Sequence, residues 1–93
     1  MTYARRTDTN HTEVIRALRR FGWCVCDTSR VGGGFPDCVA IRAGRVRFIE
    51  IKDGAKSASR RQLTPRERDL REAFMAAGVD INVVSTVDEV TRL

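Results

Sequence analysis

Apolar side chains recur at helical spacing near the start of the chain. Val14, Leu18 and Phe21 are separated by four and three residues, and Gly22 follows them directly. Residues three and four apart share one face of a helix, and glycine commonly ends a helix. The pattern therefore predicts an amphipathic helix over residues 11–21.

A second helix is predicted from its start signal. Thr64 can cap the first turn, Pro65 follows where its missing N–H costs nothing, and Glu67 can bond back to the cap residue. An apolar stripe and a terminating glycine then follow at helical spacing: Leu70, Phe74, Ala77 and Gly78. These signals predict a helix that begins at Thr64 and ends before Gly78.

Short apolar runs between and after these helices predict four strands, over residues 23–28, 38–41, 45–52 and 79–85. A turn at Ala43-Gly44 joins the second and third strands into a β-hairpin. The helix between the third and fourth strands allows those two to run parallel. Thr86 can cap a final helical turn. The expected fold class is α/β, an αβββαβ core with a mixed four-stranded sheet flanked by helices.

Alternation along the third strand divides its side chains between two faces. Phe48, Glu50 and Lys52 share one face, so a carboxylate and an ammonium project together. Hairpin pairing through the Ala43-Gly44 turn also makes Asp37 the approximate partner of Glu50. Two carboxylates are therefore expected close to each other and to one lysine.

Such an arrangement suits a divalent cation. Close carboxylates repel each other unless a hard cation lies between them, and Mg²⁺ accepts one or two carboxylates while keeping waters and phosphate oxygens. Lys52 can hold or polarise a water beside the ion. Asp37, Glu50 and Lys52 are the parts needed for metal-assisted phosphodiester hydrolysis. The alternative is that Asp37 is a turn residue after Pro36 and that Glu50 and Lys52 form an exposed ion pair.

Charge points to a polyanionic partner. The chain of 93 residues, 42% hydrophobic and 31% charged, is expected to form one domain over 1–93 and carries a net charge of +5. Fifteen of the 17 basic residues are arginines, whose planar donor fork suits phosphate. Five of the basic residues lie in an expected basic arm over 1–9 and a basic loop over 53–63. The candidate nucleic-acid contacts are Arg5, Arg6, Arg30, Gly33, Gly34, Lys56, Arg60 and Arg61, with the glycines letting the chain pass close to DNA.

Cysteine and histidine usage indicates no metal site of the zinc type. Cys24, Cys26 and Cys38 are an odd set, and Cys-x-Cys is not the usual zinc spacing. We expect all three to be small buried core residues in a reducing compartment, and His11 to be a surface residue. No apolar run is long enough to span a membrane and no secretion signal is recognised, so we expect a soluble protein.

Three segments in order carry a family resemblance: Gly34-Phe35-Pro36-Asp37, then Phe48-Ile49-Glu50-Ile51-Lys52, then a basic loop and Leu63-Thr64-Pro65 opening a helix. Together they resemble the PD-(D/E)xK nuclease superfamily. The chain is most similar to the VRR-NUC group, small phage and bacterial nucleases that resemble Holliday-junction resolvases. The resemblance covers nearly the whole chain and implies a restriction-endonuclease-like fold.

The resemblance implies roles for particular residues. Asp37 and Glu50 would be metal ligands together with the backbone carbonyl of Ile51, and Lys52 would act on the attacking water. Glu13 matches an acidic residue that many members place beside the metal, although Asn10-x-x-Glu13 is also a helix-capping arrangement. The chain departs from the family where the later helix usually offers glutamine: Glu67 stands there, and a glutamine occurs at Gln62 instead.

These observations predict an Mg²⁺-dependent endonuclease acting on DNA, with Mn²⁺ able to substitute and branched or otherwise structured DNA as the substrate. Symmetric cutting of a two-fold junction needs two active sites, so we expect a homodimer. The expected location is the cytoplasm of a bacterium or a phage-infected host. The alternatives are a non-catalytic nucleic-acid-binding module of the same fold, or a restriction-like or DNA-repair nuclease.

Overall fold

The computed structural model describes residues 10–53 and 62–93. Seven elements follow one another along this part of the chain, in the predicted αβββαβ order with a final helical turn. They are α1 (His11–Arg20), β1 (Cys24–Asp27), β2 (Cys38–Arg42), β3 (Arg45–Ile51), α2 (Pro65–Ala76), β4 (Ile81–Val84) and α3 (Val87–Val90). The predicted fold class is confirmed.

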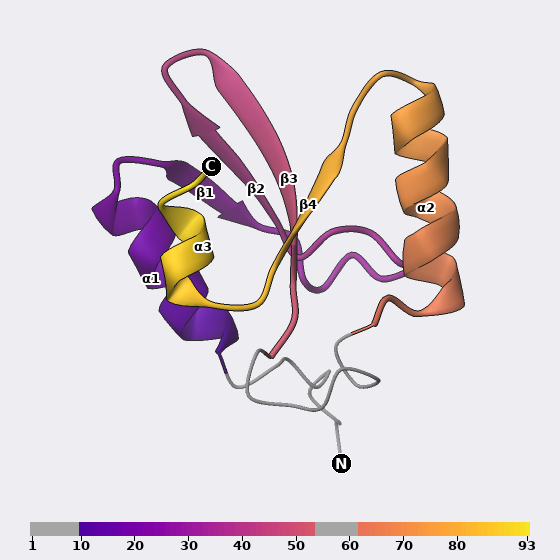
Figure 1. Ribbon diagram of the computed structural model, residues 1–93, viewed down its shortest axis with the longest axis horizontal. Helices are drawn as coiled ribbons and strands as arrows, with labels where there is room; N and C mark the ends of the chain where they lie inside the picture. Colours follow the sequence, from indigo (N-terminus) through magenta and orange to yellow (C-terminus); the bar gives the residue numbers. More distant parts are fainter. Residues whose placement is uncertain (1–9, 54–61) are drawn as a thin grey trace.

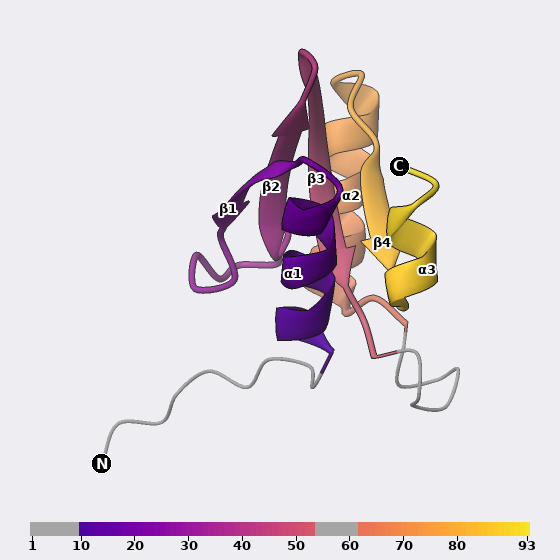
Figure 2. The same ribbon diagram turned by 90° about the vertical axis from the view of Figure 1, so that its left-hand side faces the viewer.

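The strands form one mixed sheet in the order β1-β2-β3-β4. The β1–β2 and β2–β3 pairs are antiparallel, and the β3–β4 pair is parallel. Figures 1 and 2 show α1 and α3 together on one face of the sheet and α2 on the other. The sheet is therefore the middle layer of three, and its two faces have different environments.

The hydrophobic core lies between the sheet and α1 with α3. Val14 and Leu18 of α1 are fully buried against Ile49 and Ile51 of β3, and Val90 of α3 packs into the same cluster. Ile49 and Ile51 are thus on the core face, as strand alternation predicts. Glu50 and Lys52 consequently project from the other face, the side on which α2 lies.

The hairpin between β2 and β3 has the predicted register. Cys38 pairs with Ile49, which brings Asp37 opposite Glu50 at the end of the ladder. Ala43 and Gly44 form the turn with φ values of 50° and 75°. Two successive residues with positive φ are what a tight two-residue hairpin turn requires, and this fixes the register locally.

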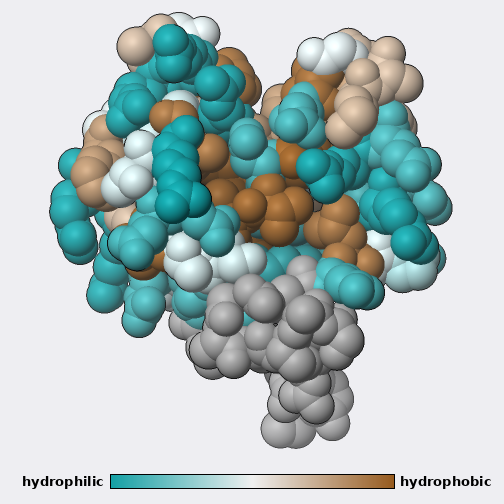
Figure 3. All heavy atoms as spheres, viewed as in Figure 1, coloured by the Kyte–Doolittle hydropathy of each residue, from teal (hydrophilic) through white to brown (hydrophobic). Residues whose placement is uncertain are grey.

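Helix α2 is attached to the sheet by aromatic contacts. None of its residues is fully buried. Phe74 meets Phe48 of β3 at 5.2 Å between ring centroids and Phe35 of the β1–β2 loop at 6.2 Å, both edge to face. Above these contacts the face is uncovered, and Figure 3 shows hydrophobic side chains on the floor of a hollow between the sheet and α2. Ile41 and Val46 of the hairpin are nearly half exposed there.

Several sequence expectations are wrong in detail. Cys24 and Cys26 are exposed, because β1 is an edge strand and their side chains lie on the face that α1 does not cover; Cys38 is buried as expected. Asn10 makes no side-chain cap to α1, so the capping arrangement that was the alternative role for Glu13 does not form. The first and last strands are shorter than predicted, since the Thr28 carbonyl accepts the Val31 N–H in a turn and the Val79 N–H bonds back to the carbonyl of Phe74.

The expected basic arm over 1–9, and Lys56, Arg60 and Arg61 of the expected basic loop, lie outside the described residues. Within residues 10–53 and 62–93, none of the helices has both the length and the apolar character needed to cross a bilayer.

Candidate functional site

Asp37 and Glu50 are brought together at the end of the β2–β3 hairpin. Oδ2 of Asp37 accepts a hydrogen bond of 2.8 Å from the backbone N–H of Ile51, the residue directly after Glu50. The hairpin register, with Cys38 opposite Ile49, continues to Asp37 opposite Glu50. The predicted juxtaposition of the two carboxyls is therefore present in the structure.

The loop before β2 fixes Asp37 from the other side. Thr28 donates its backbone N–H to the carbonyl of Asp37 at 2.8 Å and its hydroxyl to the carbonyl of Pro36 at 2.7 Å. These bonds close the loop over residues 28–37 at its base. The position of the Asp37 side chain thus depends on backbone contacts at both ends, and it needs no ligand to be held there.

Burial and crowding make both carboxyls hard to ionise. Glu50 is 4% exposed. Burial, a hydrogen bond with Glu67 and the charge of Asp37 raise the pKa of Glu50 to about 10. Burial also raises the pKa of Asp37, against the opposing effect of the Ile51 N–H. Without a cation, Glu50 is therefore neutral near pH 7, and a bound cation would compensate for its charge in place of the proton.

The oxygens present fit a hard divalent ion. Asp37, Glu50 and the backbone carbonyl of Ile51 would supply a small set of oxygen ligands, the number that Mg²⁺ takes when water and phosphate complete its shell. Within the part of the chain that the structure describes, no group of three or more His, Cys, Asp or Glu side chains is arranged to hold a metal ion. Glu13 is exposed on α1 and so does not join the two carboxyls in one acidic cluster.

Lys52 lies beside the carboxyls, directly after β3 ends. Its Nζ is 3.8 Å from Oε1 of Glu50 and 2.8 Å from Oε1 of Glu67. Burial alone would raise the pKa of Glu67, but hydrogen bonds with Glu50, Lys52 and the Thr64 backbone lower it to about 2. Glu67 is therefore the charged partner of Lys52 in the cluster. Gln62, the other position considered for the family's glutamine, is exposed.

Asn10 anchors the backbone at Lys52. Its side-chain amide donates to the carbonyl of Lys52 at 2.8 Å and to the carbonyl of Ser85 at 2.9 Å. These bonds tie the start of α1 to the ends of β3 and β4. The Asn10 side chain therefore holds the backbone next to the candidate site. The local capping pattern in the sequence did not indicate this role.

His11 was expected at the surface, and this is wrong. It is 7% exposed, and its Nε2 lies 3.0 Å from Oδ2 of Asp27. Ser29 donates both its backbone N–H and its hydroxyl to Oδ1 of the same carboxylate. Burial opposes ionisation of Asp27, but the bonds from Ser29 and His11 lower its pKa to about 2. A lone histidine at a helix start gave no signal for this, because Asp27 is 16 residues away.

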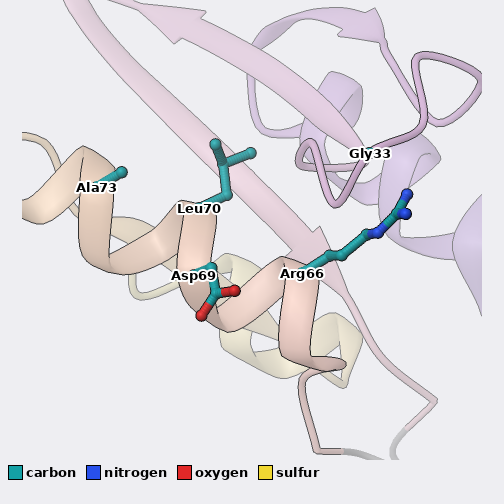
Figure 4. Close-up of a pocket in the computed structure, with 5 residues that line it drawn as sticks. All are labelled: Gly33, Arg66, Asp69, Leu70 and Ala73. Carbon is teal, nitrogen blue, oxygen red and sulfur yellow. The ribbon is translucent and has the colours of Figure 1, made fainter.

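Gly33 and Gly34 lie against the first turn of α2. A pocket of about 380 Å³ lies between this loop and α2, and it is lined by Gly33, Arg66, Asp69, Leu70 and Ala73. Figure 4 shows Arg66 extending from α2 toward the loop that carries Gly33. Arg30 is exposed on the same loop. The other candidate nucleic-acid contacts, Arg5, Arg6, Lys56, Arg60 and Arg61, lie outside the described residues.

Comparisons with known proteins agree with this architecture. No protein-family model matches the sequence, and no curated protein matches it. The fold is similar to that of a solved structure described as a VRR_NUC domain, with a TM-score of 0.68, 24% sequence identity, and coverage of 91% of this chain and 94% of that one. The predicted resemblance is confirmed for the fold.

Proposed function

We propose that the protein is a metal-dependent endonuclease that hydrolyses phosphodiester bonds in DNA. The observation that carries this proposal is the pair formed by Asp37 and Glu50, a partly buried and a buried carboxyl held beside Lys52. Crowded carboxyls whose ionisation is suppressed cost stability, and they are typical of a site that binds a cation and performs chemistry. The fold shared with a VRR_NUC domain supports the same activity.

In this proposal Asp37, Glu50 and the carbonyl of Ile51 hold Mg²⁺, and Mn²⁺ can replace it because it accepts the same oxygen ligands. The ion supplies a water of lowered pKa and stabilises charge on the phosphate. The Ile51 N–H already holds the Asp37 carboxyl in place in the folded protein, so little conformational entropy is lost when this ligand binds an ion.

Lys52 orients the attacking water in this proposal. Its ammonium shares a face with Glu50 and lies 3.8 Å from that carboxyl. An ammonium group at this place can donate a hydrogen bond to a water beside the metal. Its positive charge can also offset negative charge that builds up on the phosphate. Lys52 therefore acts on the nucleophile and on the developing charge, while the carboxyls fix the ion.

The substrate in this proposal is branched or otherwise structured DNA, contacted through the candidate arginines named above. The net charge of +5 favours a polyanion. A homodimer would supply two cutting sites for a two-fold substrate. A bacterial or phage-infected cytoplasm is the expected setting.

A non-catalytic DNA-binding module of the same fold is the second candidate. The candidate arginines would serve it equally well. It gains nothing from Glu50, however, because a buried carboxyl whose ionisation is suppressed beside Asp37 lowers the stability of the fold and offers no positive charge to phosphate. The acidic pair therefore favours catalysis over binding alone.

A panel of labelled DNAs tests the proposal. Four-way junction, flap, linear duplex and single-stranded DNA of equal length are incubated with the purified chain in Mg²⁺, in Mn²⁺ and in chelator. We expect cleavage in both metals, greatest on the branched substrates, and none in chelator. Binding of all four DNAs without cleavage in either metal would establish the binding module instead, and equal cleavage of linear duplex would favour a restriction-like or repair nuclease.

A further inference from the structure

The ammonium of Lys52 is held by a residue from a different element. Its 2.8 Å contact with Glu67 is a charge-assisted hydrogen bond, whereas the 3.8 Å separation from Glu50 is too long for one. The side chains of Lys52 and Glu67 are only 12% and 14% exposed. Water screens such a pair far less than a surface pair, so its geometry is well determined. The direction of the Lys52 side chain therefore depends on Glu67.

The Glu67 carboxylate is fixed independently of Lys52. The same Oε1 accepts the backbone N–H of Thr64 at 2.8 Å, and the Thr64 hydroxyl accepts the Glu67 N–H at 3.2 Å. This reciprocal cap forms at the start of α2, where Pro65 favours helix initiation. Lys52 thus bonds to an acceptor that the helix cap already holds in place.

The first turn of α2 is in turn fixed relative to Asp37. Gly34 approaches it so closely that a Cβ there would come within 2.7 Å of the Arg66 carbonyl group. Gly34 lies three residues before Asp37 on the same loop. Close contact with the α2 backbone therefore sets the distance between the loop that carries Asp37 and the helix that carries Glu67.

We propose that Glu67 is a positioning residue that holds the ammonium of Lys52 at the catalytic face. This inference rests on the proposed function. The Glu67 carboxylate links the α2 cap to the end of β3, while the contact of Gly34 with the α2 backbone keeps the Asp37 loop beside them. A glutamine at this position could keep both hydrogen bonds through its carbonyl oxygen, but with a weaker bond to the ammonium.

Three variants separate positioning of Lys52 from stability of α2. Glu67→Ala removes the acceptor, Glu67→Gln keeps an acceptor without charge, and Thr64→Ala removes one cap bond while leaving the Glu67 carboxylate beside Lys52. In single-turnover cleavage at saturating DNA and Mg²⁺, we expect Glu67→Ala to lose about 10- to 100-fold in rate with unchanged DNA affinity. Glu67→Gln should recover at least half of that loss on a logarithmic scale, and Thr64→Ala should stay within about threefold of wild type.

The inference is overturned if Glu67→Ala cleaves at the wild-type rate, if Glu67→Gln is as slow as Glu67→Ala, or if Thr64→Ala reproduces the loss. The last result would assign the effect to the helix cap.

A second readout needs no nuclease activity. The chain has only two lysines, Lys52 and Lys56, so mass spectrometry can follow an amine-reactive label at each. We expect the labelling ratio of Lys52 to Lys56 to rise at least about fivefold in Glu67→Ala and not in Thr64→Ala, because a released ammonium becomes accessible. An unchanged ratio contradicts the inference. If the wild type cleaves no DNA, the proposed function fails, and this ratio still decides whether Glu67 holds Lys52.

Discussion

Oδ2 of Asp37 accepts a 2.8 Å hydrogen bond from the backbone N–H of Ile51. This bond joins the end of the β1–β2 loop to the position in β3 directly after Glu50. A backbone donor holds one carboxyl beside another although the two repel each other when charged. Placing the two carboxyls side by side is therefore expected to lower the free energy of unfolding by a measurable amount.

Glu50→Gln should stabilise the protein in chelator. Because burial raises the pKa of Glu50 from 4.5 to about 10, the folded state keeps a proton that the unfolded state releases between those values. Stability from this group is complete below about pH 4.5 and falls as the pH rises. We expect Glu50→Gln to gain on the order of 1 kcal/mol at pH 8 and almost nothing at pH 5, measured by urea unfolding at both pH values. A variant less stable than wild type at pH 8 would contradict this assignment.

Asp27→Asn should have the opposite pH dependence. The pKa of Asp27 is lowered from 3.8 to about 2, so its stabilising effect is present above about pH 4 and is lost as the pH falls toward 2. The side chain is 45% exposed, and solvent screening keeps the effect small. We expect Tm to fall by about 2–4 °C at pH 6, with the difference narrowing by pH 3. A difference that does not change with pH would show that the Asp27 charge is not the cause.

Phe74→Ala should weaken the packing of α2 on the sheet. Phe74 makes both edge-to-face contacts that join this helix to Phe35 and Phe48, and no residue of α2 is fully buried. We expect a loss of about 2–3 kcal/mol in the free energy of unfolding. Phe21→Ala is the matched control: Phe21 is 43% exposed, and its removal should cost less than about 1 kcal/mol. Equal losses in the two variants would exclude a special role for the aromatic cluster.

The three thiols should differ in reactivity. Cys24 and Cys26 are exposed, whereas burial and nearby carboxyls, Asp37 first among them, raise the pKa of Cys38 to about 12. We expect a thiol reagent to modify Cys24 and Cys26 at least about a hundredfold faster than Cys38 in the native protein, and all three at similar rates in urea. Fast native modification of Cys38 would show that the β2–β3 core opens readily. Peptide mapping by mass spectrometry distinguishes the three sites.

The parts of the fold that the sequence predicts are those with local signals. The Ala43-Gly44 turn determined the hairpin register, and so the pairing of Cys38 with Ile49. The Thr64 and Glu67 cap likewise defined the start of α2. In both cases the interacting residues are close in the sequence, so spacing alone carries the information.

Contacts between distant residues were not predicted. Asn10 bonds to carbonyls 42 and 75 residues away, at Lys52 and Ser85, and this overrides its local capping pattern. The burial of His11 depends on Asp27 of β1. The bond from Lys52 to Glu67 was also missed, because it forms only when α2 packs on the face that carries Glu50. These contacts depend on how the layers pack, which apolar periodicity does not specify.

We expect Asp37, Glu50 and Lys52 to perform metal-dependent cleavage while other residues bind DNA. The most direct test measures, for wild type, Glu50→Gln and Lys52→Ala, single-turnover cleavage of a four-way junction in Mg²⁺ and affinity for the same junction in chelator. We expect each variant to lose at least about 100-fold in cleavage rate and to bind DNA within about threefold of wild type, since phosphate contacts dominate affinity. Near wild-type cleavage by either folded variant would show that the substituted residue does not have its proposed role in cleavage.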